Sequence, residues 1–286
     1  MDAKTHHIVG YDALCPGRWR KRLGVKLELV ATNPANRIPL LQSGKADLIV
    51  ADITITPERA QAIDFSTPYF VTGQQFLVPA GSPDKLDEYS KARIGAVKGT
   101  TGEQALHQRF PQARVLSYDD IPLALTALRN GNVQAITQDS TILAGLLAEA
   151  PDKAKFKILP DLLSKEEIGV GVKKGEPALL KAVNDELVKL EKTGEAAKIY
   201  DVWFGPATKT PQPRAFYHRS EIICSRVYSP TPRPPRIFHV CSAPALRSVM
   251  WPSATAIIRY LTRSTYRSSP AKWWRSSALP DRENRR

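Results

Sequence analysis

The sequence predicts an α/β fold, in which strands alternate with helices and helices cover both faces of the sheets. Short apolar runs end in glycine or hydroxyl residues, and segments with the three- to four-residue apolar spacing of amphipathic helices follow them. Proline and glycine mark several of the segment ends. About 190 residues carry this pattern, which is enough chain for two modest hydrophobic cores.

The first elements form a strand–helix–strand unit. Residues 26–31 are strand-like, and residues 38–43 form a short helix that Gly44 closes. Residues 48–51 form a buried apolar strand. Pro57 then begins a helical turn, because proline lacks the amide hydrogen that a first turn leaves unpaired.

Two further strands and two helices follow. The stretches 94–102 and 133–143 each contain a strand that leads into a helix. The helix after Asp139 places Ile142, Leu143, Leu146 and Leu147 on one face. The longest predicted helix covers residues 177–192, and Gly194 closes it.

The end of the second strand carries a candidate anion site. Arg59 follows Thr54 and Thr56, so a guanidinium fork lies beside hydroxyl and backbone donors. A small carboxylate needs this combination, because the fork binds two oxygens and short donors fill their remaining lone pairs. The alternative is a surface arginine at an ordinary strand-to-helix turn.

Two other strand ends complete a site for a zwitterion. Thr100 and Thr101 add hydroxyls, and Asp139 adds an anion. Ligands of open α/β sheets usually lie outside the carboxyl ends of the strands. A guanidinium opposite a carboxylate suits a ligand that carries both a carboxylate and an ammonium group.

With these motifs in this order, the chain resembles the family 3 solute-binding proteins, the bilobal amino-acid receptors of bacterial ABC importers. The match runs from about Val25 to Phe216, apart from one earlier motif. The matching motifs are Gly10-Tyr11-Asp12, the run from Asp52 to Arg59, Asp64-Phe65-Ser66-Thr67-Pro68-Tyr69, Gly99-Thr100-Thr101, Gln138-Asp139 and Trp203-Phe204-Gly205-Pro206.

The resemblance implies a bilobal periplasmic-binding-protein type II fold, with two α/β lobes joined by a two-strand hinge. Lobe one would hold residues 1–79 plus 171–216, and lobe two residues 80–170. The crossings between lobes are expected at residues 77–81 and 167–173.

The resemblance also implies the ligand contacts. Arg59 would clamp the α-carboxylate of an amino acid, helped by Thr54 and by Thr100 or Thr101. Asp139 would bind the α-amino group. The protein would then deliver the amino acid to an ABC transporter permease, as a monomer in the periplasm.

Two residues near this site have open roles. Asp52 could be a second acidic contact to the ammonium group, or it could cap the following turn. Lys98 favours acidic or polar ligands weakly, although a lysine at a strand end is usually solvated. The amino acid itself is not identified by the sequence.

The sequence lacks the motifs of several other functions. The phosphate-loop pattern, metal-ligand spacings and the G-x-S-x-G elbow are absent, so we expect no cofactor, no metal and no enzyme activity. The alternative is an enzyme on the same scaffold, a dehydratase of the cyclohexadienyl type, with Glu58 or Glu103 recruited as general acid. No run of about 20 apolar residues predicts a membrane span.

The C-terminal segment, residues 217–286, differs in composition from the rest. It carries a net charge of +10 out of +13 and is rich in arginine, proline and serine. Only residues 254–261 form a short patterned run, so we expect the segment to be disordered and dispensable. A basic arm for nucleic acid or an anionic membrane, an appendage without a role, and an out-of-frame translation are the alternatives, of which we favour the last. We expect no nucleic-acid partner.

The N-terminal segment also departs from the family pattern. Pro16-Gly17 would break the helix expected after Gly10-Tyr11-Asp12, and residues 1–10 lack the apolar core of a signal peptide. The family's first strand is expected to be missing, since it would lie before residue 1. A non-functional, truncated or frame-shifted copy of the receptor is therefore a further alternative.

Overall fold

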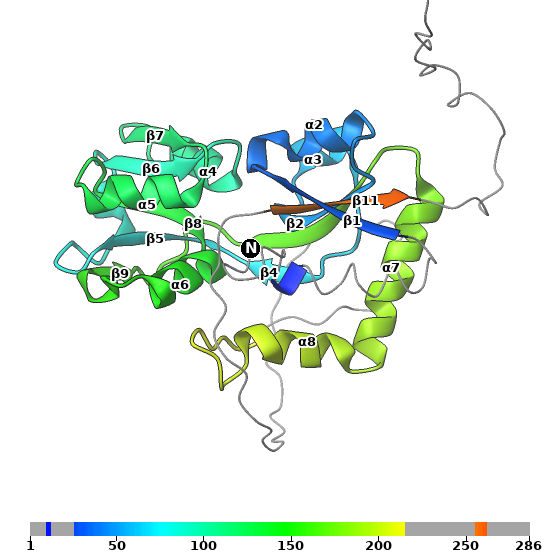
Figure 1. Ribbon diagram of the computed structural model, residues 1–286. Helices are drawn as coiled ribbons and strands as arrows, with labels where there is room; N and C mark the ends of the chain where they lie inside the picture. The colour runs from blue at the N-terminus through cyan, green and yellow to red at the C-terminus, as the bar shows by residue number, and fades with distance from the viewer. Residues whose placement is uncertain (1–9, 13–25, 215–254, 262–286) are drawn as a thin grey trace, which may run out of the picture.

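The computed structural model describes residues 10–12, 26–214 and 255–261, and for Lys26, Leu27 and residues 255–261 it gives the backbone alone. These residues form two mixed α/β lobes, each with its own sheet (Figure 1). The bilobal α/β fold predicted from the sequence is confirmed. None of the helices in these ranges has the length and apolar content that a membrane span requires.

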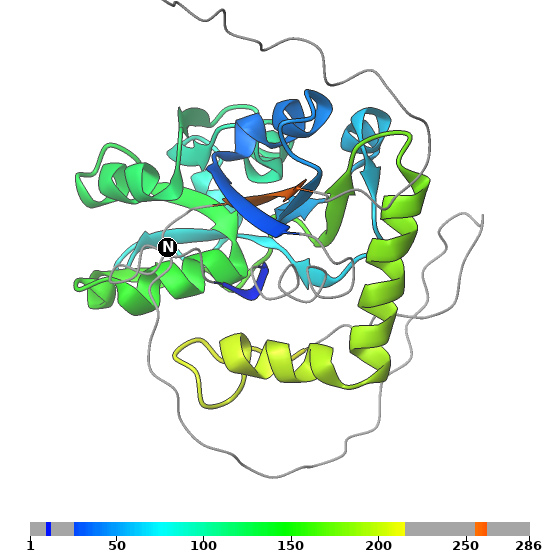
Figure 2. The same ribbon diagram turned by 45° about the vertical axis from the view of Figure 1, so that its right-hand side comes forward.

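Lobe one has a six-stranded sheet with the order β1-β11-β2-β10-β3, and β4 also pairs with β10. Helices α2 and α3 lie on one side of it, and α7 and α8 lie on the other (Figures 1 and 2). The elements are β1 (Lys26–Thr32), η1 (Pro34–Asn36), α2 (Arg37–Gln42), β2 (Leu48–Thr54), α3 (Pro57–Ala62), β3 (Asp64–Phe65), β4 (Phe70–Thr72), β10 (Glu166–Val172), α7 (Pro177–Lys192), α8 (Glu195–Phe204) and β11 (Thr255–Leu261).

Lobe two has a five-stranded sheet with the order β7-β6-β8-β5-β9. Two separate apolar clusters pack on it, one including residues of α4 and the other residues of α5 and α6. The elements are β5 (Gln74–Pro79), η2 (Leu86–Tyr89), β6 (Arg93–Val97), α4 (Thr101–Arg109), β7 (Arg114–Tyr118), α5 (Ile121–Arg129), β8 (Ala135–Asp139), α6 (Ser140–Glu149), η3 (Lys153–Lys155) and β9 (Phe156–Ile158).

The connections between the lobes lie earlier in the chain than predicted. β5 pairs with β8 and β9 of lobe two, so the first connection lies at Gly73, before the predicted crossing at residues 77–81. β10 pairs with β2 of lobe one, so the second lies at residues 159–165, before the predicted crossing at 167–173. The first predicted crossing overlaps β5 of lobe two, and the second overlaps β10 of lobe one. The prediction failed because an apolar run alone does not show which sheet it joins.

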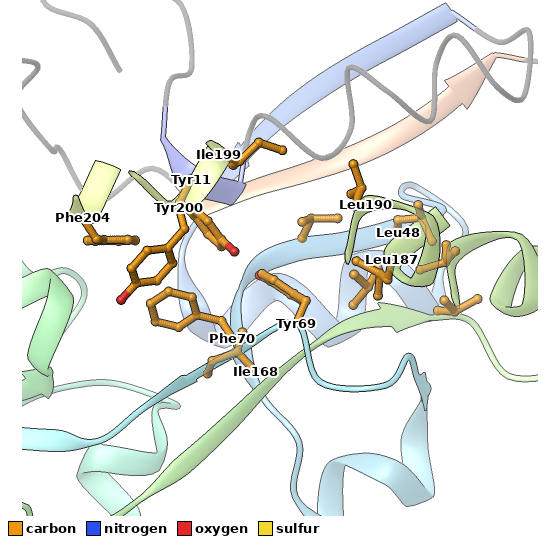
Figure 3. Close-up of a cluster of buried hydrophobic side chains, with 14 residues drawn as sticks. Tyr11, Leu48, Tyr69, Phe70, Ile168, Leu187, Leu190, Ile199, Tyr200 and Phe204 are labelled. Atoms are coloured by element: carbon orange, nitrogen blue, oxygen red, sulfur yellow. The ribbon is translucent and has the colours of Figure 1, made fainter. Parts of the chain in front are cut away.

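Aromatic side chains from distant segments form the core of lobe one beside α7 and α8 (Figure 3). Tyr11 packs against Phe70, Tyr200 and Phe204, with ring centroids 5.2, 6.1 and 5.7 Å away. Such ring pairs are worth about 0.5–1.5 kcal/mol each beyond their buried area. The motif residue Tyr11 thus joins the N-terminal motif to the last helices of the lobe.

The prediction that residues 217–286 contain no packed element is wrong at Thr255–Leu261. These residues form β11, which lies between β1 and β2 and is antiparallel to both. They belong to the patterned run 254–261, and the run's own residues do not show that two other strands flank it. The rest of the tail, and the Pro16-Gly17 region, lie outside the described residues.

Candidate functional site

A set of buried and half-buried polar side chains lies where the two lobes meet, and we call it the polar cluster. Lobe one contributes side chains from residue 12, the start of α2, the end of β2, α3 and the start of β10. Lobe two contributes from the start of β5, the start of α4 and the end of β8. Its members are Asp12, Arg37, Asp52, Thr54, Arg59, Gln74, Thr101, Asp139 and Glu166.

A bulge in β2 places Asp52 in the cluster. The pairing of β2 with β10 shifts between Gly169 and Gly171, and Asp52 has a positive φ of 46°. Bulges redirect side chains, and aspartate tolerates the left-handed region better than most residues. The Asp52 amide donates a 2.9 Å hydrogen bond to Asp12 Oδ2, and the Tyr69 hydroxyl donates a 2.7 Å bond to Asp12 Oδ1.

Two arginines face the cluster from lobe one. Arg37 Nη1 donates to the carbonyl oxygen of Asp52 at 3.1 Å. Arg59 donates through Nη1 to the Thr54 carbonyl at 3.0 Å and through Nη2 to the Gly99 carbonyl at 3.2 Å. Because Gly99 belongs to lobe two, Arg59 joins the lobes. A guanidinium has five N–H donors, so these two bonds leave donors for a ligand.

Glu166 joins both lobes at the base of the cluster. Its Oε2 accepts hydrogen bonds from the hydroxyls of Thr54 at 2.6 Å and Thr101 at 2.8 Å. Its Oε1 accepts a 2.8 Å bond from the Ser164 hydroxyl. Glu166 is only 4% exposed, so these donors replace the water that its carboxylate loses on burial.

Asp139 has fewer donors than Glu166, and its carboxyl group contacts that of Asp52. Its Oδ2 accepts a 3.1 Å hydrogen bond from Gln74 Nε2, but its Oδ1 is buried and receives none from the described residues. Asp139 occupies the N-cap position of α6, yet its side chain makes no capping hydrogen bond. A buried carboxylate oxygen without a donor is costly, and a bound cation would supply the missing donor.

The acids of the cluster influence each other's ionisation. Burial, followed by repulsion from Asp12, raises the pKa of Asp52 to about 7, and the Arg37 guanidinium opposes this shift. Burial, with repulsion from Asp52 and Glu166, raises the pKa of Asp139 well above its ordinary value. An ammonium group placed between Asp52 and Asp139 would favour the ionised form of both.

The basic side chains show the opposite effect. Burial, helped by repulsion from Arg59, lowers the pKa of Arg37 to about 10, although the Asp52 carboxylate opposes the shift. Burial also lowers the pKa of Arg59. Arginine is not deprotonated in proteins, so both guanidinium groups are charged at neutral pH and can bind an anion.

The sequence model of the bacterial extracellular solute-binding proteins, family 3, matches residues 1–206. The chain belongs to this family. The glutamine-binding protein GlnH of the Bacillus subtilis ABC transporter is 37% identical over 180 residues, which are 62% of this chain and 65% of that protein. The chain thus spans slightly less than two thirds of that relative. A probable histidine-binding protein of Neisseria gonorrhoeae is 32% identical over 71% of this chain and 77% of its own.

Solved structures of the family agree with the fold. An ancestral arginine-binding protein bound to glutamine has a TM-score of 0.68 at 33% identity, covering 72% of this chain and 92% of its own. The ancestral amino-acid-binding protein AncCDT-1, a precursor of cyclohexadienyl dehydratase, has a TM-score of 0.65 at 32% identity, covering 71% and 88%. These relatives are binding proteins, and the family members are extracellular or periplasmic.

The structure brings most of the predicted site residues together. Asp52, Thr54, Arg59, Thr101 and Asp139 all belong to the polar cluster. The two threonines face each other across the lobes, with 3.4 Å between their hydroxyl oxygens.

Two predicted site residues lie elsewhere. The Thr100 hydroxyl caps α4, accepting from the Glu103 amide at 3.3 Å and donating to the Val97 carbonyl at 2.7 Å. Lys98 is exposed, and its ammonium group makes no hydrogen bond to the described chain. The choice between Thr100 and Thr101 therefore favours Thr101, and Lys98 has the solvated position usual for a lysine.

Four members of the cluster were missed: Arg37, Gln74, Glu166 and the carboxylate of Asp12. Glu166 lies in the run Lys165-Glu166-Glu167, which looks like an exposed strand edge. Gln74 opens an otherwise apolar strand, and a polar residue at such a position was the one signal that could have indicated it.

Proposed function

We propose that this chain binds a free amino acid between its two lobes and delivers it to the membrane permease of an ABC importer. Family membership supports the type of ligand and the type of partner. The arrangement of the polar cluster supports the ligand's position, since cationic donors and unsatisfied acids face each other there. We further propose that the protein acts as a monomer in the periplasm.

The ligand carboxylate would lie against Arg59. This guanidinium already bridges Thr54 of lobe one and Gly99 of lobe two, and its remaining N–H groups can form a bidentate pair with a carboxylate. The hydroxyls of Thr54 and Thr101 lie near enough to each other to complete the oxygen contacts. Arg37 holds the backbone of Asp52 and adds positive charge.

The ligand ammonium group would lie between Asp52 and Asp139. The observation that carries this assignment is the buried Oδ1 of Asp139, which has no donor although its carboxyl group interacts with that of Asp52. Two carboxyl groups in contact must share a proton or bind a cation. An ammonium has three donors and would satisfy both acids.

The charge of the cluster favours neutral and cationic amino acids over acidic ones. Four carboxyl groups, those of Asp12, Asp52, Asp139 and Glu166, interact with two guanidinium groups. A second negative charge on the ligand would increase the excess of negative over positive charge in the cluster. The relatives described above are named for glutamine, histidine and arginine, which agrees with this preference.

We assign the site to binding rather than to catalysis. Glu58 is exposed. The Glu103 carboxylate is held by the Gly99 amide at 2.8 Å and by the Ser117 hydroxyl, so it is already engaged by partners outside the polar cluster. Cyclohexadienyl dehydratase activity remains the rival, because AncCDT-1 is described as its precursor and because Asp139 has a raised pKa.

Titration calorimetry of the full chain tests the proposal. We expect saturable binding, with one site, of one or more neutral or cationic amino acids, and no product after incubation. Glutamate and aspartate should bind at least tenfold more weakly. Formation of an aromatic product from a cyclohexadienyl substrate would favour the enzyme. Absence of binding heat with every standard amino acid would contradict the receptor.

A further inference from the structure

β11 occupies a position that the rest of lobe one leaves open. β1 and β2 both run antiparallel to β11, so they are parallel to each other with one strand between them. Neighbouring strands lie about 4.8 Å apart, so β1 and β2 are about 9.6 Å apart and cannot hydrogen-bond directly. Within the described residues, β11 is the strand that pairs with β1.

We propose that the gap between β1 and β2 is a strand-binding site, and that the chain's own C-terminal segment, Thr255–Leu261, fills it and completes lobe one. The pairing with β1 extends along both strands without a shift, from Lys26 opposite Leu261 to Thr32 opposite Thr255. On its other edge β11 reaches β2, where Ile257 lies opposite Ile49 and Ile258 opposite Leu48.

The gap requires a strand because its β2 wall is buried and has a polar backbone edge. Leu48 and Ile49 are fully buried, and on their other side they pair with Val172 and Gly171 of β10. An empty gap would leave the backbone N–H and C=O groups along one edge of β2 unpaired in the interior, which costs free energy at each group. Adding a strand satisfies both edges at once.

The sequence of the tail agrees with this role. Residues 254–261 are the single patterned run that we found in the basic segment 217–286. Isoleucine and tyrosine in this run favour strands, whereas the surrounding prolines do not. This run lies opposite all seven residues of β1.

The occupant is a segment of the same chain rather than of a second copy. Residues 215–254 connect Arg214 to β11. A segment of about 40 residues can reach roughly 130 Å when fully extended, so the chain is long enough to return to the gap. Because β11 is covalently tied to the lobe that it completes, its pairing is intramolecular and is favoured over pairing with a strand from another molecule in dilute solution.

The strand also bears on the ligand site. β1 leads through η1 to Arg37, which holds the carbonyl of Asp52 at the end of β2. β11 fixes the separation of β1 and β2 and therefore the distance between these two site residues. We infer that the polar cluster keeps its geometry only while β11 is in place, and this step alone depends on the proposed function.

Engineered disulfides in the full chain test the pairing directly. With Cys15, Cys224 and Cys241 replaced by serine, the double variant Ala31→Cys/Ala256→Cys joins two residues that are opposite each other in the register. The control, Ala31→Cys/Ile257→Cys, is one residue out of register, which turns the second side chain to the other face of the sheet. We expect rapid oxidation to a crosslinked monomer for the first pair only.

Three outcomes would overturn the proposal. Absence of a crosslink in both pairs means that the gap does not hold this segment. Equal crosslinking of both pairs means that the segment is near the gap without a fixed register. Disulfide-linked dimers from the first pair identify a strand of a second copy as the occupant.

A proline substitution measures the contribution of the strand. Ile257→Pro removes a backbone donor inside a central strand, whereas Ser276→Pro makes the same change outside β11. By hydrogen exchange we expect the first variant to lose protection in β1 and β2 and to keep it in β6 of lobe two. Its ligand affinity should fall at least tenfold, and the second variant should match the parent.

The readouts separate this inference from the proposed function. Crosslinking and exchange need no ligand, so they can succeed even if no amino acid binds. Unchanged protection of β1 in Ile257→Pro would overturn the inference, while loss of protection without loss of affinity would overturn only the coupling to the polar cluster.

Discussion

The two lobes have similar layers but differ in how the chain builds them. All five strands of the lobe-two sheet come from one continuous stretch, between Gln74 and Ile158. The lobe-one sheet draws β1 to β4, then β10, and finally β11 from segments that are far apart in the sequence. Lobe two can therefore form from contacts within one stretch, whereas lobe one depends on segments made much later.

The lobes also differ in what they contribute to the polar cluster. Lobe one supplies both guanidinium groups, Arg37 and Arg59, while lobe two supplies Asp139, whose Oδ1 is unsatisfied. The carboxylate half of an amino acid would thus bind mainly to lobe one, and the ammonium half would be shared between the lobes. Under this proposal, ligand binding would join the lobes, because Asp139 of lobe two completes a site whose other charged groups come from lobe one.

The largest effect should come from breaking the lobe-one half of the site. Arg59→Ala should weaken ligand binding about 100- to 1000-fold, corresponding to about 3–4 kcal/mol, because the ligand carboxylate then loses its buried partner. Arg59→Lys should also bind poorly, since an ammonium cannot replace the bidentate fork. Titration calorimetry measures both.

Arg109→Ala is the matched control for the arginine prediction. Arg109 is an exposed lobe-two arginine that lies 3.5 Å from Asp87 at the surface. It should keep the parent affinity. Near-parental affinity of Arg59→Ala would remove Arg59 from the carboxylate site.

Breaking the lobe-two half should give a smaller loss. Asp139→Asn should weaken binding about 30- to 100-fold, or about 2–3 kcal/mol, because the ammonium loses a charged partner. The ligand-free protein should become no less stable, since the change removes the repulsion between Asp139 and Asp52. The affinity measured by calorimetry should therefore fall, while the melting temperature of the ligand-free protein should not.

The contrast with an ordinary helix cap makes this prediction specific. Asp120 caps α5, and its carboxylate accepts a 2.9 Å hydrogen bond from the Leu123 amide. Asp120→Asn should change neither affinity nor stability by much, since asparagine caps as well as aspartate. If Asp139→Asn behaves like Asp120→Asn, Asp139 does not bind the ammonium group.

The acid pair should make both stability and binding depend on pH. Asp52 has a pKa of about 7 in the ligand-free fold against 3.8 as its ordinary value. The folded state binds the proton more tightly, so its stabilising contribution is present below about pH 4 and is lost as the pH rises through 7. Thermal unfolding of the ligand-free chain should show this decline.

Ligand affinity should change in the opposite direction. An ammonium group needs the ionised acid, so below pH 7 each pH unit should reduce affinity by up to about tenfold for one displaced proton. Calorimetry in buffers of different ionisation enthalpy counts that proton. Asp52→Asn should flatten the profile, and an unchanged slope in that variant would assign the proton to another group.

Local patterns predicted much of the fold in both lobes. The predicted helix 177–192 matches α7, Pro177–Lys192, because its apolar spacing, first-turn proline and closing glycine are all local signals. The sheet memberships of β5 and β10 were wrong, and the packing of β11 was not foreseen. Each of these depends on which distant edge the strand pairs with, and that information is not in the strand's own residues.

The candidate site was predictable to a similar extent. Arg59 and Asp139 stand out because each follows a recognisable strand, and the structure brings both into the polar cluster. Glu166 could not be found, since its environment depends on Thr54 and Thr101 from the two different lobes. A buried acid looks like an exposed one until its donors are known.

The smallest predicted effect concerns how closely the lobes approach each other. Gly99 of lobe two has a φ of 77°, and a Cβ there would lie 3.1 Å from the Cα of Ala35 in lobe one. Gly99→Ala should therefore strain the loop and separate the lobes slightly, which would weaken the contact of Arg59 with the Gly99 carbonyl. We expect ligand affinity to fall about three- to tenfold, corresponding to about 1 kcal/mol.

Gly131→Ala separates backbone strain from contact between the lobes. Gly131 has a similar φ of 71° in lobe two, but a Cβ there would have no atom within 4 Å. Both variants should lose similar stability in thermal unfolding, because alanine is strained at either position. Only Gly99→Ala should lose affinity in calorimetry. Equal affinities would mean that ligand binding does not require the lobes to approach as closely as they do here, and the bond between Arg59 and Gly99 would then have no part in holding the ligand.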